Sequence, residues 1–300
     1  MSTWPNFFII GAGKAGTTSL YYYLKQHPEV FMSRFKEPKF FALEGHALDF
    51  KGPHDERIRR GTTTTLAEYL ELFAAVKDEK AIGEASTVYL GDPRAPAAIA
   101  RRLPEAKIVA ILRHPAERAF SAYQHLLRDA YEPLPSFEAA LAAEPQRAAE
   151  GWYVQYQYKG RGFYGRYLQR YFDLFPRANI RIYLYEDYLR RPAWLLADLF
   201  GFLGVDPTFR PDTSPRHNIS GRPRSARLQR WLTRSHPFKE ALKTWIPERW
   251  GHRVISWVQP FNVVRGAMDP ATRRRLIEEY RDDIALLQTL IGRDLSHWLT

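Results

Sequence analysis

Short apolar or β-branched segments recur along the chain, separated by stretches in which apolar residues repeat at helical spacing. The short segments are typical of buried strands and lie at residues 7–11, 29–32, 80–84, 107–112 and 180–185. The helical patterns are clearest at residues 17–26, 115–128, 163–175, 193–203 and 270–290. Strands that alternate with helices favour a parallel sheet with helices on both faces. The pattern therefore predicts a three-layer α/β fold.

The length and the apolar content are those of one globular unit. The chain has 300 residues, of which 45% are apolar, so it can bury a core of ordinary size. It shows no repeat, low-complexity tract or linker, and we expect a single domain over residues 1–300. Residues 207–270 are rich in Pro, Arg and Trp and carry no strand pattern. We expect short helices and loops there, packed on one side of the sheet.

The charge and the cysteine count narrow the possible functions. Lys and Arg number 44 against 33 Asp and Glu, a net charge of +11 that indicates a partner carrying negative charge. The sequence has no zinc-ligand set and no RNA-binding aromatic signature, which argues against nucleic acid as that partner. Cysteine is absent, and this excludes disulfides, thiolate metal sites and a cysteine nucleophile.

Signals for membrane insertion or secretion are also missing. The longest strongly apolar stretch, residues 193–205, is interrupted by Asp198 and is shorter than the ~20 residues that a membrane-spanning helix needs. The N-terminal residues lack the basic start, apolar middle and cleavage site of a secretory signal. We expect a cytoplasmic protein without a transmembrane segment.

The most informative segment is G-A-G-K-A-G-T-T at residues 11–18, between the first predicted strand and the first predicted helix. At such a junction, backbone N–H groups and the positive end of a helix can enclose a phosphate or a sulfate. In this interpretation Lys14 contacts a terminal anionic group and Gly16 allows close approach. The hydroxyls and amides of Thr17 and Thr18 bind a phosphate. The alternative without a function is a tight turn with a surface lysine.

Two other anion-binding loops share part of this pattern. The glycines match the G-x-G-x-x-G of dinucleotide-binding folds, which place an acidic residue at the end of the second strand to hold the ribose. Here that strand runs into Ser33 and Arg34, so only an NADP-dependent reductase fits. A Walker A loop has its lysine directly after the last glycine, whereas here Thr17 follows Gly16 and the lysine is Lys14. The pattern argues against hydrolysis of ATP or GTP.

The segment F-F-I-I-G-A-G-K-A-G-T-T-S-L resembles the phosphosulfate-binding loop of sulfotransferases that use 3′-phosphoadenosine 5′-phosphosulfate (PAPS). A second segment, I-L-R-H-P-A-E-R-A-F-S-A-Y, is similar to the part of that family that holds the 3′-phosphate of the donor. Arginine suits this task because its planar fork donates two parallel hydrogen bonds. The resemblance implies that the donor contacts Lys14, Ala15, Gly16, Thr17, Thr18, Ser19, Arg113 and Ser121.

Later segments extend the resemblance over nearly the whole chain. G-F-Y-G-R-Y-L-Q-R-Y-F-D-L-F-P, I-R-I-Y-L-Y-E-D and L-I-G-R-D-L-S-H-W are similar to the carbohydrate-directed, heparan-sulfate-type and bacterial branches of the family. The resemblance implies a P-loop NTPase-like sulfotransferase fold, PAPS as co-substrate, adenosine 3′,5′-bisphosphate (PAP) as product, and no metal. In the family a loop near the C-terminal end also contacts the 3′-phosphate. Gly221 with Arg222 and Arg265 with Gly266 are both candidates for it.

Sulfuryl transfer needs a cation at the leaving phosphate oxygen and a base for the acceptor's proton. Lys14 is the predicted cation. Glu37 is the predicted base, because Pro38 favours an extended backbone before it and the segment K-E-P-K-F-F follows the second predicted strand. This segment resembles the one that carries the catalytic glutamate in heparan-type sulfotransferases. The alternative is that Glu37 only pairs with Lys36 or Lys39.

Glu84 is a second candidate for the base. It stands in G-E-A-S-T-V-Y-L, the segment from which the cytosolic small-molecule branch of the family supplies a histidine. Heparan-type enzymes usually carry a lysine there after the glutamate, whereas here Ala85 follows Glu84. His114 precedes a proline at a predicted helix start, so we expect it to be structural.

The acceptor implied by the resemblance is a hydroxyl or an amine on a carbohydrate or another large molecule. Loops around residues 45–65 and 131–158 combine aromatic and basic residues that would either stack on acceptor rings or pack a surface lobe. The aromatic residues in question are Trp152, Tyr153, Tyr156 and Tyr158. Two other functions remain open: an NADP-dependent reductase, and a module that binds a nucleotide or polyanion without catalysis.

Overall fold

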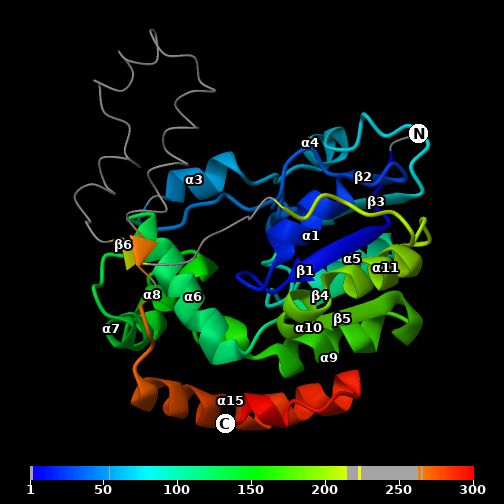
Figure 1. Cartoon of the computed structure of the whole chain (residues 1–300). Coiled ribbons are helices and arrows are strands. Elements are labelled where there is room, and N and C mark those ends of the chain that lie inside the picture. The colour runs from blue at the N-terminus through cyan, green and yellow to red at the C-terminus, as the bar shows by residue number, and fades with distance from the viewer. Residues whose placement is uncertain (1–2, 54, 215–221, 224–262, 265) are drawn as a thin grey trace, which may run out of the picture.

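A five-stranded parallel sheet lies at the centre of the protein, described here from a computed structural model (Figure 1). The structure describes residues 3–53, 55–214, 222–223, 263–264 and 266–300. The strands are β1 (Phe7–Gly11), β2 (Val30–Met32), β3 (Ala81–Ala85), β4 (Lys107–Leu112) and β5 (Ile180–Leu184). Their order across the sheet is β2-β3-β1-β4-β5, and each neighbouring pair is parallel. The five predicted strands are all present.

Side chains that alternate along β1 divide the core into two layers. Phe7 and Ile9 join one buried apolar cluster, and Phe8 and Ile10 join the other. The helices over the first face are α1 (Thr17–Leu24) and α11 (Pro192–Leu203). Those over the second are α5 (Ala95–Arg102), α6 (Pro115–Arg128), α9 (Tyr164–Leu174) and α15 (Pro270–Ile291). Helices cover both faces, so the predicted three-layer α/β fold is confirmed.

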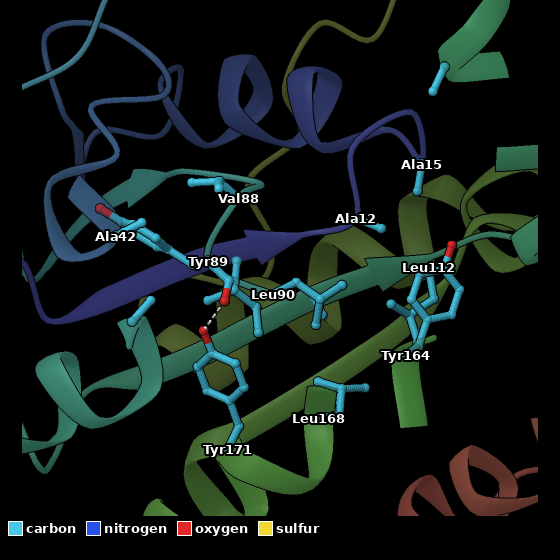
Figure 2. Packing of buried hydrophobic residues seen from close by; sticks show 14 of the residues in the cluster. Ala12, Ala15, Ala42, Val88, Tyr89, Leu90, Leu112, Tyr164, Leu168 and Tyr171 are labelled. Carbon is cyan, nitrogen blue, oxygen red and sulfur yellow. Dashed lines mark hydrogen bonds between the residues drawn. The ribbon is translucent and has the colours of Figure 1, made fainter. Parts of the chain in front are cut away.

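Helix α9 joins the sheet to the C-terminal helix α15, and Figure 1 shows it between them. Its buried residues Tyr164, Leu168 and Tyr171 point toward the sheet in Figure 2. Tyr171 donates a hydrogen bond from its hydroxyl to the carbonyl of Tyr89, at 2.8 Å. The hydroxyl of Tyr164 donates to the carbonyl of Arg113, at 2.9 Å. This helix therefore braces the loops that follow β3 and β4.

The ends of the long helices follow from local sequence. His114 caps α6, because its Nδ1 accepts from the amide of Ala116 at 3.2 Å and Pro115 occupies the first turn. The expected structural role of His114 is thus confirmed. Asp269 caps α15 in the same way by accepting from the amide of Thr272 at 2.7 Å.

A lobe beside the sheet contains α7 (Phe137–Ala142) and α8 (Glu144–Ala149). At its centre Arg147 donates two hydrogen bonds to Glu132, at 2.9 and 2.7 Å, and its guanidinium lies over the Trp152 ring. Three of the aromatic residues in question are buried, namely Tyr153, Tyr156 and Tyr158. They pack this lobe, so for these three the packing interpretation holds and acceptor stacking does not.

The remaining segments are short. They include α2 (Phe40–Leu43), α3 (Asp55–Arg60), α4 (Leu66–Glu71) and α10 (Tyr185–Arg190). A two-stranded antiparallel sheet, β6 (Arg222–Pro223) with β7 (Val263–Val264), lies beside α6. Most of the expected short helices and loops of residues 207–270 lie outside the described residues. Among the helices that the structure describes, none has both the length and the apolar character needed to cross a bilayer.

Candidate functional site

The loop between β1 and α1 has the geometry of an anion site. The amide of Ala12 donates to the carbonyl of Ile111 at 2.7 Å, which ties the loop to β4. Gly16 precedes α1 with a φ of 101°, a left-handed conformation that side chains disfavour. Because glycine has no side chain to cap the helix, the first amides of α1 can face an anion. Thr17 and Ser19 begin this helix and are buried.

Lys14 sits in this loop under strain and in a positive environment. Its φ of 70° is left-handed, which costs a non-glycine residue about 1–3 kcal/mol and is found mostly at functional sites. Burial, together with the charges of Arg128 and Arg113, lowers the pKa of the Lys14 ammonium from 10.5 to about 8. The Asp129 carboxylate offsets part of this effect. A strained, buried cation with more cationic than anionic neighbours suggests a site that is completed by an anionic ligand.

Arg113 lies next to this loop because β4, which it follows, is the neighbour of β1 in the sheet. Its guanidinium carbon is 5.3 Å from the centre of the Tyr185 ring. A Cβ built on Gly16 would lie 3.5 Å from the same ring. Tyr185 thus lies close to both predicted anion-binding segments, which follow the carboxyl ends of the neighbouring strands β1 and β4. Ser121, two turns into α6, is buried.

The strand order argues against the reductase. In the dinucleotide-binding fold the order is 3-2-1-4-5-6, so that the acidic end of the second strand adjoins the first. Here β3 lies between β1 and β2, and the end of β2 is one strand away from the loop. A residue at the end of β2, which holds the ribose in that fold, would therefore lie one strand away from the loop.

Glu37 is held at the carboxyl end of β3. The Thr87 amide donates to its Oε2 at 3.0 Å, the Thr87 hydroxyl to Oε1 at 2.9 Å, and the Lys36 ammonium to Oε1 at 2.8 Å. Burial alone would raise the pKa of this carboxyl, but Lys36, Lys39 and Thr87 outweigh burial and keep the pKa below 4.5. Glu37 is therefore ionised at neutral pH, as a base must be.

The structure bears on two statements made about Glu37. The extended backbone expected before Pro38 is wrong, because Glu37 has a left-handed φ of 66°. Its amide donates to the carbonyl of Ala85 at 2.9 Å while its side chain reaches Thr87, and these two anchors impose the turn. The ion pair named in the alternative interpretation, with Lys36 or Lys39, is present with Lys36. The Lys39 ammonium instead donates to the carbonyl of Gly61 at 3.1 Å.

Glu84 occupies a different environment from Glu37. It is fully buried, and its two oxygens accept from the hydroxyls of Tyr69 at 2.7 Å, Ser86 at 2.7 Å and Tyr89 at 2.9 Å. Burial raises the pKa of the Glu84 carboxyl to about 7. The Glu84 carboxyl is closed off from solvent, and three hydroxyl groups already occupy its oxygens. It is therefore poorly placed to take a proton from an acceptor. Glu37 is the better candidate for the base.

Replacing Glu84 by glutamine is expected to change how stability depends on pH. Folding raises the pKa of this carboxyl from 4.5 to about 7, so the folded protein keeps a proton that the unfolded chain releases. Wild-type stability therefore falls as pH rises through this window, whereas the glutamine cannot ionise. Across this pH window the unfolding free energy of Glu84→Gln should therefore increase relative to that of the wild type, by up to about 3 kcal/mol. Urea denaturation across the window measures it, and a constant difference would contradict the buried, protonated Glu84.

The two candidate loops near the C-terminal end are brought together. In the β6–β7 ladder the backbone of Arg222 pairs with Val264, directly before Arg265. The carbonyl of Gly266 accepts from the Gln124 side chain of α6 at 3.1 Å. Gly221 and Arg265 themselves lie outside the described residues. Both loops thus reach α6, the helix that carries Ser121. The choice between them as the loop that contacts the 3′-phosphate is therefore not an exclusive one.

Three residues of the site were not found by sequence reasoning. Thr87 holds Glu37, Tyr185 lies close to both anion-binding segments, and Arg161 donates to the carbonyl of Thr87 at 3.0 Å. Tyr185 directly follows β5, and Thr87 lies just after the end of β3. In a parallel sheet ligands bind at the carboxyl ends of the strands, so these positions could have marked both residues. Arg161 lies far along the chain in G-R-G, and nothing local marks it.

Comparison with known proteins agrees with this geometry. A sequence model of the Sulfotransferase family matches residues 5–210, which is more than half of the chain. This chain belongs to the sulfotransferase family. The matched region contains all five strands of the parallel sheet. It also contains the β1–α1 loop, Glu37 and the Arg113 segment.

Two curated proteins illustrate the similarity of this chain to individual members of the family. Human bifunctional heparan sulfate N-deacetylase/N-sulfotransferase 3 is 30% identical over 210 residues, which are 68% of this chain and 23% of that protein. The membrane-associated sulfotransferase kil1 of Dictyostelium discoideum is 32% identical over 146 residues, 47% of this chain and 28% of that one. This chain therefore spans about a quarter of the length of these curated relatives.

One solved structure resembles the protein along its whole length. The crystal structure of a sulfotransferase from Alicyclobacillus acidocaldarius has a TM-score of 0.78 and 34% sequence identity, and the alignment covers 99% of this chain and 100% of that chain. The predicted sulfotransferase fold is thereby confirmed.

Proposed function

We propose that the protein transfers the sulfuryl group of PAPS to a hydroxyl or an amine of an acceptor, a carbohydrate or another large molecule. One observation supports the choice of donor: the β1–α1 loop and Arg113 follow neighbouring strands, and both lie against the Tyr185 ring. PAPS has a phosphosulfate at one end and a 3′-phosphate at the other, so two neighbouring anion-binding segments suit it. The name of the human relative, a heparan sulfate N-sulfotransferase, supports a carbohydrate acceptor and leaves the amine open.

The residues divide between the two ends of the donor. Residues 14–19, with Lys14 and the first amides of α1, fit the phosphosulfate end, because anions bind at helix N-termini. Arg113 and Ser121 fit the 3′-phosphate, with the β6–β7 loops alongside α6. A Cβ on Gly16 would be in van der Waals contact with the Tyr185 ring, at 3.5 Å, so Gly16 brings the loop close to this ring.

The transfer is a displacement in which the chain supplies charge and a proton acceptor. A bond forms between the acceptor oxygen or nitrogen and sulfur, and the bond between sulfur and the phosphate oxygen breaks. Lys14 stabilises the charge that grows on this leaving oxygen. The Glu37 carboxylate takes the acceptor's proton, and PAP leaves as the product.

The assignment of Arg113 can be tested with a pair of ligands that differ by one phosphate. PAP carries the 3′-phosphate and adenosine 5′-monophosphate lacks it. Arg113→Met should weaken PAP binding by about 10- to 100-fold, since a hydrogen bond to a charged group is worth about 1.5–3 kcal/mol. It should change binding of adenosine 5′-monophosphate by less than about threefold, and calorimetry measures both.

Two results would count against the proposal. Failure of the wild-type protein to bind PAP at micromolar concentration would remove the donor assignment. Tight PAP binding without transfer from labelled PAPS to any of a panel of hydroxyl and amine acceptors would support the non-catalytic nucleotide-binding module instead.

A further inference from the structure

The ammonium of Lys36 lies beside the carboxylate assigned as the base. Its Nζ donates to Oε1 of Glu37 at 2.8 Å, and 18% of its side-chain surface is exposed. Among the residues that the structure describes, the Lys36 side chain makes no other hydrogen bond and has no other carboxylate within 4.0 Å. An ammonium has three N–H donors, so two of them are available to a ligand.

Thr87 connects Lys36 to the β1–α1 loop. The Thr87 hydroxyl donates to the same Oε1 of Glu37 at 2.9 Å. A Cβ built on Gly13 would lie 3.3 Å from this hydroxyl, so the residue next to Lys14 in the loop packs closely against Thr87. The Lys36 ammonium is therefore close to the loop that carries Lys14.

The charges of the two lysines show the same proximity. Burial is the largest cause of the lowered pKa of the Lys14 ammonium, and the charge of Lys36 adds to it together with those of Arg128 and Arg113. The charge of Asp129 opposes them. Like charges that repel each other across a small space are relieved by a ligand with negative oxygens.

A sulfuryl group in transfer lies between the leaving oxygen and the acceptor. The three oxygens that stay on sulfur are negative, and the attacking atom becomes more negative as Glu37 takes its proton. Because these charges repel each other, a cation near both ends of the displacement stabilises the transition state. Lys36 is near both ends, since it is bonded to Glu37 and close to the loop of Lys14.

We propose that Lys36 is a second catalytic cation, whose ammonium donates hydrogen bonds to the sulfuryl oxygens of bound PAPS and keeps them during transfer. The inference rests on the proposed sulfuryl transfer. Lys36 forms no covalent bond and keeps its protons. Sulfur gains a bond to the acceptor as its bond to the phosphate oxygen breaks, and Glu37 takes the acceptor's proton. The ion pair with Glu37 holds the ammonium in this position.

Turnover of Lys36 variants tests the contact. Lys36→Met keeps the apolar stem and removes the charge, so kcat at saturating PAPS and acceptor should fall by about 10²- to 10³-fold, the range for loss of one preorganised donor. Lys36→Gln is a second neutral variant and should show the same loss, also if the methionine variant fails to fold. Lys36→Arg keeps the charge and should restore kcat to within about tenfold of the wild type.

Lys80→Met is the matched control, because it also removes the lysine of a Lys–Glu ion pair. Lys80 pairs with Glu29, and 61% of its side-chain surface is exposed. It directly precedes β3 and so lies at the amino end of this strand, away from the site. Its kcat should stay within about twofold of the wild type, since exposed ion pairs contribute little.

The pH dependence separates contact with the sulfuryl group from an effect on the base alone. Burial raises the pKa of the Glu37 carboxyl, and the charge of Lys36 is the largest influence that lowers it. Loss of Lys36 should therefore move the acid decline of kcat/KM to higher pH. The other titratable or charged groups whose charges reach Glu37 are Lys39, Glu84, Tyr153 and Arg161. A kcat of Lys36→Met that equals that of the wild type above this decline would mean that Lys36 only tunes the base, and would overturn the proposal.

A binding comparison tests the same contact without turnover. PAPS carries the sulfuryl group and PAP lacks it, and both are titrated by calorimetry into the whole protein in the absence of an acceptor. Lys36→Met should weaken PAPS binding by about tenfold or more beyond any change in PAP binding, because it removes a hydrogen bond to a charged group. An equal change for both ligands would contradict the contact.

Failure of this inference and failure of the proposed function give different results. If the wild type binds neither PAPS nor PAP, the donor assignment and the role of Lys36 are both wrong. If the wild type transfers the sulfuryl group and Lys36→Met retains its kcat, only the role of Lys36 is wrong. If PAPS binds and no acceptor of the panel reacts, the difference between PAPS and PAP binding decides the contact by itself.

Discussion

Replacing Lys14 by methionine is expected to lower kcat by about 10³-fold, the range found when one preorganised donor is removed from a site of developing charge. Methionine keeps the apolar stem and loses the charge, so the leaving phosphate oxygen has no neighbouring cation. PAP affinity should fall by a smaller factor, because the amides of α1 and Arg113 remain. Single-turnover kinetics with labelled PAPS, with exposed Lys77→Met as the matched control, measure the effect.

The pH dependence of PAP binding gives the same residue a second test. The pKa of the Lys14 ammonium is about 8 in the free protein, and a bound phosphate would raise it. The charged form binds, so affinity should be constant below this pKa and fall by up to about tenfold per pH unit above it. Lys14→Arg stays charged and should remove this fall. A kcat for Lys14→Met within about threefold of wild type would refute the role of Lys14 in the chemical step.

Glu37→Gln is expected to lower kcat by about 10²- to 10⁴-fold, the contribution typical of a general base. The amide side chain has nearly the same shape and can still accept from Thr87, so the site should keep its structure. PAP affinity should change by less than about twofold, since Glu37 is assigned to the acceptor and not to the donor. Initial rates at saturating PAPS, with exposed Glu71→Gln as the control, measure the change in turnover.

The decline of kcat/KM at low pH distinguishes Glu37 from Glu84 as the base. The pKa of the Glu37 carboxyl lies below 4.5, so kcat/KM should not decline until the pH falls below that value. The pKa of the Glu84 carboxyl is about 7, and a profile that declines below pH 7 would indicate that Glu84 is the base. Full activity of Glu37→Gln together with loss of activity in Glu84→Gln would establish the same reversal.

Strand positions and the anion loop could be predicted because their signals are local. The run of residues 7–11 is apolar on both faces and ends in glycine, and only a strand buried between two helical layers accommodates it. The start of α6 was equally readable, since His114 and Pro115 both favour a first helical turn. The boundaries of such elements depend on a few adjacent residues.

The sequence could name both carboxylates but could not separate them. Glu37 and Glu84 each follow or end a predicted strand, and each stands in a segment that resembles the family's catalytic region. Only packing shows that Tyr69, Ser86 and Tyr89 enclose Glu84, whereas Glu37 is bonded to Thr87 and Lys36 at the strand ends. The difference in their pKa values arises from these long-range neighbours.

By itself, the sequence determined the layers, the strand positions and where the two candidate anion-binding segments lie, because hydrophobic periodicity and glycine spacing act within one element at a time. Tertiary structure alone decided the strand order, which places β3 between β1 and β2 and argues against a dinucleotide fold. It also brought Tyr185 and Arg161 to the loop from more than a hundred residues away. Such contacts are set by the packing of whole elements, and no local pattern encodes them.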